Sequence, residues 1–212
     1  MSVRRIHPLP VRLTHWLNAL VMVAMFMSGW GIYNASPLFG FHIPTWATLG
    51  GWLGGAIAWH LAVMWVLMAN GLFYLLYSLG TRHRRALRPE PLAAVWRDAN
   101  DALHLRLAHR LGHYNAVQRL LYCAVLAAGV LLVASGLAIW KPVQLYWLAE
   151  LFGGFDVARY VHFFAMSAVA AFVVVHLLLV LMVPRTLWPM ISDGRFADES
   201  RPSGQPQEPR HD

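Results

Sequence analysis

The residues of this chain best suited to bind a metal are two histidines, His162 and His176, within one uncharged stretch. From Tyr160 to Pro184 the sequence has no Lys, Arg, Asp or Glu, and a run of that length is enough to cross a bilayer as a helix. Fourteen residues, at about 100° each, return to nearly the same helix face and rise about 21 Å. One membrane helix would therefore carry two imidazoles on one stripe, one near each side of the membrane.

An imidazole in hydrocarbon is costly unless it has a partner. For one isolated histidine, a hydrogen bond to a backbone carbonyl or to a Ser or Thr hydroxyl is a sufficient explanation. Two histidines at opposite depths favour ligation of two metal centres, and haem is the obvious candidate, because its iron takes axial histidines and its porphyrin suits an apolar slot. The chain has one cysteine, Cys123, and no CxxCH motif, so such a haem would be non-covalent and b-type.

The composition is that of a membrane protein. Of the 212 residues, 58% are hydrophobic and 13% are charged. Apolar runs predict four membrane-spanning helices, at residues 13–33, 45–79, 120–140 and 157–184, and Arg159 is the one charged residue within them. The predicted fold class is therefore all-α, an integral membrane four-helix bundle. Residues 1–195 would form this domain, and residues 196–212 a polar, Pro-rich tail that we predict to be disordered.

Two further segments have patterns of their own. Residues 92–111 have apolar residues at helical spacing with Arg, Asp and His between them, which predicts a short amphipathic helix on the membrane surface between the second and third spans. The second span is longer than a bilayer requires and should tilt or project. Near its start it contains GGWLGG, residues 50–55, whose glycines suit close helix packing, room for a flat macrocycle, or both.

The cationic residues predict an orientation. Of the 17 Lys and Arg, three lie in the N-terminal segment, eight in the middle loop and four in the C-terminal tail, which leaves Lys141 and Arg159. The positive-inside rule places both termini and the middle loop in the cytoplasm. The basic balance of the chain therefore reflects topology and anionic lipid, and the sequence has no motif for binding nucleic acid.

This orientation sorts four intramembrane histidines by depth. His15, at the start of the first span, and His176, near the end of the fourth, would lie on the cytoplasmic side. His60, on the second span, and His162 would lie nearer the outer side. Depth therefore pairs His15 with His176 and His60 with His162, and each pair could clamp one iron, with the two irons about 20 Å apart along the membrane normal. A single haem, with two structural histidines, is the less favoured alternative.

The motifs around these histidines resemble those of the bacterial four-helix, di-haem b-type cytochromes. These are the membrane subunits of Ni-Fe hydrogenase, formate dehydrogenase and thiosulfate reductase, and the b561-type cytochromes. The resemblance covers about residues 4–195. It rests on RLTHWLNA around His15, the span containing His60, HYNAVQRLLY at the start of the third span, SGLAIWKP at its end, the LFGG turn, and the HF…H pair of the fourth span.

The resemblance implies two haem b groups, bound by axial ligands at His15, His60, His162 and His176, and a quinone site near the cytoplasmic haem.

The residues that match the quinone region are Asn115 and Gln118, at the inner start of the third span. A helix cap and interfacial polar residues would explain them nearly as well. Arg12 and Arg119 flank the same depth and could pair with haem propionates, although arginines at an inner boundary are also expected from topology alone.

We therefore predict a di-haem cytochrome b of the bacterial cytoplasmic (inner) membrane. It would pass electrons between the quinone pool and a periplasmic redox partner. The nearest resemblance is to cytochromes that serve a periplasmic molybdopterin oxidoreductase, and substrate chemistry would belong to that partner. The protein would be surrounded by membrane lipid, and the sequence leaves open whether it forms a homo-oligomer.

Three other functions are left open at this point. The protein could act alone, oxidising superoxide at the outer face and reducing quinone, with Lys141 and Arg159 as a thin cationic funnel. It could instead be a small transporter or proton channel with a histidine relay. That function predicts a colourless protein, and the sequence has no inverted repeats or broken helices to support it. An inert membrane anchor would leave four intramembrane histidines unexplained.

Overall fold

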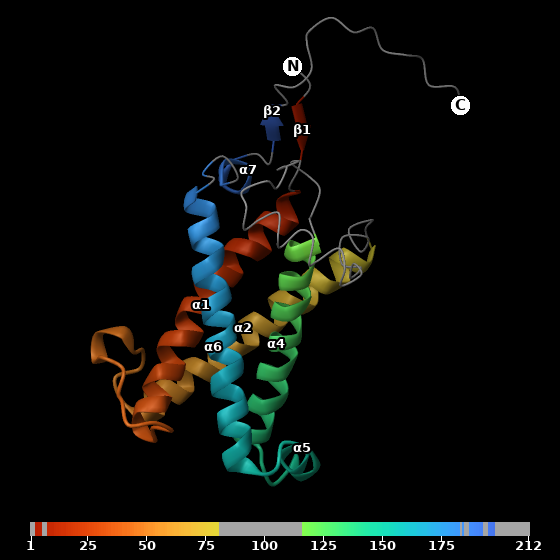
Figure 1. The fold of residues 1–212 in the computed structure, drawn as a ribbon. Coiled ribbons are helices and arrows are strands. Elements are labelled where there is room, and N and C mark those ends of the chain that lie inside the picture. Colours follow the sequence, from red (N-terminus) through yellow and green to blue (C-terminus); the bar gives the residue numbers. More distant parts are fainter. Residues whose placement is uncertain are drawn as a thin grey trace, which may run out of the picture.

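Four long helices dominate the structure, a computed structural model that describes residues 3–5, 8–80, 116–182, 184, 187–192 and 195–197. They are α1 (Leu9–Ala35), α2 (Leu53–Gly80), α4 (Ala116–Trp140) and α6 (Phe155–Met182). Each contains a stretch long and apolar enough to cross a membrane. The prediction of an all-α, four-helix membrane bundle is confirmed (Figure 1).

Short elements mark the two ends of the bundle. They are the 3-10 helix η1 (Thr45–Ala47), the helices α5 (Tyr146–Leu151) and α7 (Trp188–Ile191), and the strands β1 (Val3–Arg5) and β2 (Arg195–Ala197). The two strands pair antiparallel next to the start of α1 and the end of α6. We call this the terminal end, and the opposite end, with η1 and α5, the loop end (Figure 1).

Some sequence predictions lie outside the described residues. These are the amphipathic helix at residues 92–111 and the tail beyond residue 197. The predicted domain boundary at residue 195 falls within β2, so the chain keeps regular structure at least to Ala197.

The four long helices form two antiparallel hairpins. Helix α1 packs along α2, and α4 packs along α6, whereas the two hairpins contact each other far less. The short helix α5 closes the second hairpin, where Leu148 and Ala149 pack with Ala138 and Ala158 in a small core. The arrangement leaves the space between the hairpins to side chains that project from α1, α2 and α6.

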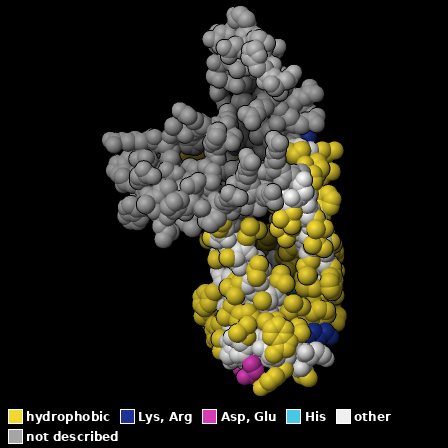
Figure 2. Space-filling model, turned by 90° about the vertical axis from the view of Figure 1, so that its right-hand side faces the viewer, with side chains coloured by type: hydrophobic (Ala, Val, Ile, Leu, Met, Phe, Trp, Pro, Cys, Tyr) yellow, Lys and Arg dark blue, Asp and Glu magenta, His cyan; other side chains and the backbone are white. Residues whose placement is uncertain are grey.

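The described part of the bundle buries small apolar and small polar residues and exposes large apolar ones, as expected for helices in lipid. The fully buried side chains Ser28, Ser78 and Ser135 are small and polar, while large apolar residues such as Leu20, Leu72 and Val130 are exposed. A buried serine can satisfy its hydroxyl with a carbonyl of its own helix. The described part of the face in Figure 2 is mostly hydrophobic, and its acidic side chains lie at the loop end. This surface is suited to contact lipid tails.

Helix α2 begins eight residues later than the sequence predicted, at Leu53 instead of Thr45. Gly50 and Gly51 have φ values of 110° and 72°, a left-handed backbone that favours glycine. A Cβ at Gly55 would collide with the Gly50 carbonyl. These glycines therefore form a tight turn before α2, which neither of the sequence interpretations anticipated. With 28 residues, α2 is still longer than a bilayer requires.

Contacts at the loop end join the two hairpins. The Arg159 guanidinium on α6 donates hydrogen bonds to the carbonyl and hydroxyl oxygens of Ser36, directly after α1. Phe163, next to His162 on α6, packs against Tyr33 and Phe39, with ring centroids 5.5 and 5.3 Å away. These contacts hold the α1–α2 hairpin at a fixed distance from α6 at this end.

Candidate functional site

The four histidines singled out from the sequence meet as two pairs. The rings of His15 on α1 and His176 on α6 have centroids 6.1 Å apart and planes at 63°. The rings of His60 on α2 and His162 on α6 have centroids 6.4 Å apart and planes at 68°. We call them the terminal-end pair and the loop-end pair. The structure thus brings together the same partners that depth alone had suggested.

The spacing within each pair suits one metal ion held between two imidazoles. A coordinating nitrogen lies about 2 Å from its metal, and the ring centre about 1 Å beyond, so two imidazoles on opposite sides of one metal have centroids about 6 Å apart. Both measured distances agree with this value. Within the described ranges, no three His, Cys, Asp or Glu side chains gather around one point, so each pair would supply two protein ligands.

The two pairs lie at opposite ends of the bundle. His162 and His176 share α6 and are fourteen residues apart, which places the pairs about 21 Å apart along that helix. Each pair also spans the two hairpins, because one of its histidines belongs to α1 or α2 and the other to α6. A planar group set between two such histidines would lie in the space between the hairpins.

Each histidine of the loop-end pair is hydrogen-bonded to a buried serine on the neighbouring helix. Ser28 Oγ on α1 lies 3.0 Å from His60 Nδ1, and Ser135 Oγ on α4 lies 3.0 Å from His162 Nδ1. The sequence analysis missed both serines. The one available signal was the Ser-Gly dipeptide that α1 and α4 share, in MSGWGIY and ASGLAIW.

The glycine after each serine leaves space for the imidazole. A Cβ at Gly29 would stand 3.5 Å from Cε1 of His60, and a Cβ at Gly136 would stand 3.2 Å from Cε1 of His162. A methyl group at position 136 would push against the ring of His162, whereas a methyl group at position 29 would make ordinary contact with the ring of His60. The Ser-Gly pair therefore both binds Nδ1 and allows the ring to approach the helix.

Near the terminal-end pair, a buried amide connects α2 to α1. The Nδ2 of Asn70 donates a hydrogen bond of 3.0 Å to the carbonyl oxygen of Thr14, and both side chains are buried. Thr14 directly precedes His15, so Asn70 fixes the backbone that carries this histidine. The rings of Trp16 and Phe172 lie 5.5 and 6.0 Å from those of His15 and His176.

The other predicted site residues are placed in different ways. The Arg12 guanidinium donates hydrogen bonds to the carbonyl oxygens of Met190 and Ile191 on α7, at 3.3 and 3.1 Å, so it holds the chain after α6. Gln118 and Arg119 lie in the first turns of α4, but their side chains are outside the described part. Asn115 lies wholly outside it.

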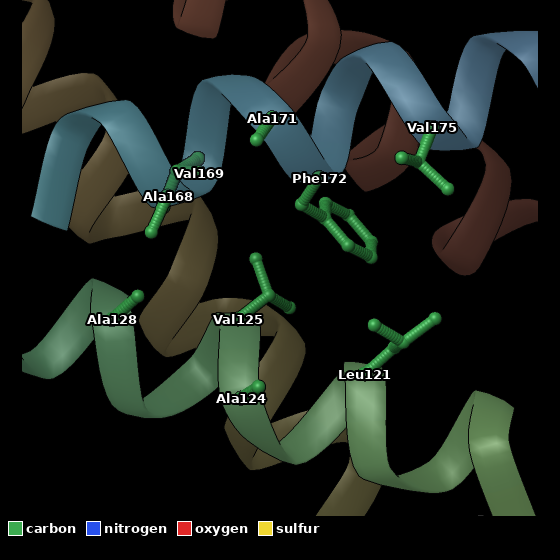
Figure 3. A pocket seen from close by; sticks show the side chains of 9 residues that line it. All are labelled: Leu121, Ala124, Val125, Ala128, Ala168, Val169, Ala171, Phe172 and Val175. Atoms are coloured by element: carbon green, nitrogen blue, oxygen red, sulfur yellow. The ribbon is translucent and has the colours of Figure 1, made fainter.

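An apolar cavity of about 370 Å³ lies between α4 and α6. Nine residues line it: Leu121, Ala124, Val125, Ala128, Ala168, Val169, Ala171, Phe172 and Val175 (Figure 3). Phe172 also stacks on His176, with planes at 16°. The cavity is therefore next to the terminal-end pair, and its lining suits a hydrocarbon group.

These residues fit haem in both ligand chemistry and surroundings. Paired imidazoles are common axial ligands, and the helices that carry these histidines are long and apolar, as a porphyrin site requires. Each loop-end histidine also has a hydrogen-bond partner at Nδ1, as metal-binding histidines usually do at the ring nitrogen that does not bind the metal.

Comparisons with known proteins agree with this geometry. The family described as prokaryotic cytochrome b561 matches residues 6–193. A protein of Azospira oryzae named "Putative protein-methionine-sulfoxide reductase subunit YedZ1" is 50% identical over 192 residues, which cover 90% of this chain and 97% of that protein. No solved structure matches. The family match spans all four long helices and both histidine pairs, and the chain therefore belongs to the prokaryotic cytochrome b561 family.

Proposed function

We propose that this cytochrome carries two haem b groups and passes electrons between the two sides of the membrane. His15 and His176 would hold one iron, and His60 and His162 the other. One observation supports this most directly: two imidazole pairs, 6.1 and 6.4 Å between centroids, share α6 at opposite ends of the bundle.

The haems would supply reversible one-electron redox chemistry. The protein's own residues would hold and insulate them. Histidines from both hairpins fix the two sites at separate depths, and the apolar helices around them exclude water. No residue needs to act as an acid or base for electrons to move between such sites. The protein sets the potentials through ligands, burial and nearby hydrogen bonds.

The terminal end would face the cytoplasm of a bacterial inner membrane. Basic residues of the N-terminal segment, middle loop and tail support this, because the positive-inside rule counts them at the cytoplasmic side. The loop end, with η1 and α5, would then face the periplasm. The loop-end haem would exchange electrons with a periplasmic partner.

The name of the Azospira oryzae relative guides the choice of partner. That protein is described as a subunit of a protein-methionine-sulfoxide reductase, and its 50% identity supports a similar assembly here. The partner would be a periplasmic oxidoreductase acting on oxidised methionine, of the molybdopterin type suggested by the sequence motifs. Kinship with the hydrogenase, formate dehydrogenase or thiosulfate reductase cytochromes stays a prediction from those motifs.

A quinone would exchange electrons with the terminal-end haem. Asn115 and Gln118 remain the proposed polar contacts, because α4 starts at Ala116 at this end. The cavity between α4 and α6 begins at Leu121, about one turn above Gln118, and reaches Phe172 beside His176. It could take the isoprenoid tail of a quinone whose ring lies near those polar residues.

The contacts of the two cations at the loop end give little support to the superoxide alternative. It relied on Lys141 and Arg159 to attract an anion. The Arg159 guanidinium donates to Ser36, and the Lys141 ammonium lies over the Trp140 ring at 4.9 Å. Both cations therefore have structural contacts. The proton-channel alternative does not account for two facing imidazole pairs at metal-binding distance.

A haem count of the purified full chain tests the proposal. We expect two haem b per chain in the dithionite-reduced spectrum, and one in each of H15A and H60A. The matched control is H42A, which removes an exposed histidine of the α1–α2 loop and should keep both haems. A colourless protein, or single variants that keep two haems, would contradict the proposed ligands.

A further inference from the structure

Two identical contacts support the loop-end histidines, and none is present at the terminal-end pair among the described residues. Ser28 and Ser135 each lie 3.0 Å from the Nδ1 of a histidine on the neighbouring helix. His15 and His176 instead contact the aromatic rings of Trp16 and Phe172. Among the described residues, the two sites thus differ in that only the loop-end histidines have a serine at Nδ1.

The direction of the serine–histidine hydrogen bond follows from the other contacts of the hydroxyl. Ser28 Oγ lies 2.7 Å from the Ala24 carbonyl oxygen, and Ser135 Oγ lies 2.6 Å from the Leu131 carbonyl oxygen. A hydroxyl has one proton, and a carbonyl can only accept. The hydroxyl therefore donates to its own helix, and its lone pair accepts the Nδ1 proton of the histidine. The same proton is shared with a backbone carbonyl oxygen, that of Met25 for His60 and that of Leu132 for His162.

This arrangement leaves Nε2 of both histidines without a proton. A neutral imidazole has one protonated and one free nitrogen. With the proton held at Nδ1, the Nε2 lone pair is free to bind a metal. The alternative direction, with serine donating to Nδ1, would leave two helix carbonyls without this donor and would put the proton on Nε2, where no metal could bind.

We infer that Ser28 and Ser135 are positioning residues that fix the Nδ1-protonated form of His60 and His162 and make the loop-end haem the more electron-rich of the two sites. The inference rests on the proposed haem ligation. A histidine that donates its second N–H becomes a more basic ligand, and a more basic ligand stabilises ferric over ferrous iron. The loop-end haem should therefore have its midpoint potential lowered by these two hydrogen bonds.

The test is a redox titration of four full-length proteins: wild type, S28A, S135A and the control S167A. Ser167 makes the same type of bond to its own helix, 2.9 Å to the Phe163 carbonyl oxygen, and in the described part it has no imidazole partner. We expect S28A and S135A each to shift the potential of one haem upward, with additive shifts in the double variant. S167A should leave both potentials unchanged. Threonine at position 28 or 135 keeps the hydroxyl and should restore the wild-type potential.

Three outcomes separate this inference from the proposed function. If the wild type contains fewer than two haems, the ligand assignment fails. If it contains two but S28A and S135A leave both potentials unchanged, or shift them no more than S167A, only the serine inference is overturned. If both potentials shift equally, the effect is not local and the inference is overturned as well.

A second measurement decides the question if the alanine variants lose haem. H176A should keep only the loop-end haem, and H60A only the terminal-end haem. Electron–nuclear double resonance of the ferric proteins detects exchangeable Nδ1 protons. After transfer to D₂O, these protons should persist longer in H176A, where buried serines accept them, than in H60A. Equal exchange in the two proteins would overturn the inference.

Discussion

The imidazole of His162 lies against the backbone of Gly136 more tightly than that of His60 against Gly29. A Cβ at Gly136 would stand 3.2 Å from Cε1 of His162, closer than ordinary van der Waals contact, whereas a Cβ at Gly29 would stand 3.5 Å from Cε1 of His60. The two Ser-Gly pairs are alike in their hydrogen bonds but differ in how much space they leave. The same Gly to Ala substitution should therefore affect haem binding differently at the two positions.

We expect G136A to weaken haem binding at the loop end and G29A to leave it unchanged. In G136A the ring of His162 must move by a few tenths of an ångström, and overpacking of this kind costs about 1–3 kcal/mol. In G29A the new methyl makes ordinary contact, and a Gly to Ala change inside a helix contributes up to about 1 kcal/mol of stability. Transfer of haem to an apoprotein acceptor measures the difference. Equal haem loss from both variants would contradict the measured contacts.

Much of the fold could be predicted because the chain has almost no charge within its spans. The uncharged runs predicted the number of long helices. The depth of each histidine within its helix then indicated which of the four could lie close together, namely His15, His60, His162 and His176. Depth in a membrane is one-dimensional, so residue counting along a helix is enough to estimate it. Counting residues paired His15 with His176 and His60 with His162. These are the partners whose ring centroids lie 6.1 and 6.4 Å apart.

Contacts across helices were beyond this reasoning because they depend on which helix faces meet. Nothing in the sequence showed that Ser28 faces α2 or that Asn70 reaches the backbone of α1. The predicted start of α2 was wrong because the run of uncharged residues continues through the loop before the helix. The boundary between loop and helix is set by the left-handed backbone of Gly50 and Gly51. The sequence suggested haem propionates as partners of Arg12 and did not show its hydrogen bonds to α7, which is nearly 180 residues away in sequence.

The two histidine pairs should behave as separate units in a double-mutant analysis. H15A and H176A should each remove the same haem, so the double variant H15A/H176A should lose no more than either single variant. H15A/H60A should lose both haems, because its residues belong to different pairs. Such non-additivity within a pair, and additivity between pairs, is expected for residues that share one ligand. Haem per chain is the measurement, and a loss of both haems in H15A/H176A would contradict the pairing.

Removing the Asn70 side chain should affect the terminal-end site alone. N70A deletes the 3.0 Å hydrogen bond to the Thr14 carbonyl oxygen, next to His15. A hydrogen bond between membrane helices contributes about 0.6 kcal/mol on average and up to about 1.7 kcal/mol. We therefore expect the terminal-end haem to be bound about threefold more weakly, and up to about sixteenfold, while the loop-end haem serves as the internal control. Equal weakening at both sites in a haem-transfer assay would show a general loss of stability instead.

Filling the cavity between α4 and α6 should separate quinone exchange from haem binding. Val125 lines this cavity (Figure 3), whereas Val130 on the same helix is 71% exposed on the outer surface. We expect V125W to exclude an isoprenoid tail and to reduce the rate of haem reduction by a long-chain quinol at least tenfold. V130W, the matched control, should reduce it little, because its indole would face lipid.

The same variants distinguish a quinone tail from a porphyrin as the occupant of this cavity. If V125W keeps two haems and still reacts normally with a tailless quinol, the cavity holds the tail. A fall to one haem per chain would mean that the terminal-end porphyrin extends into it. An unchanged rate with the long-chain quinol would exclude the cavity from quinone binding, because the indole would occupy part of the 370 Å³ space in which the tail is proposed to lie.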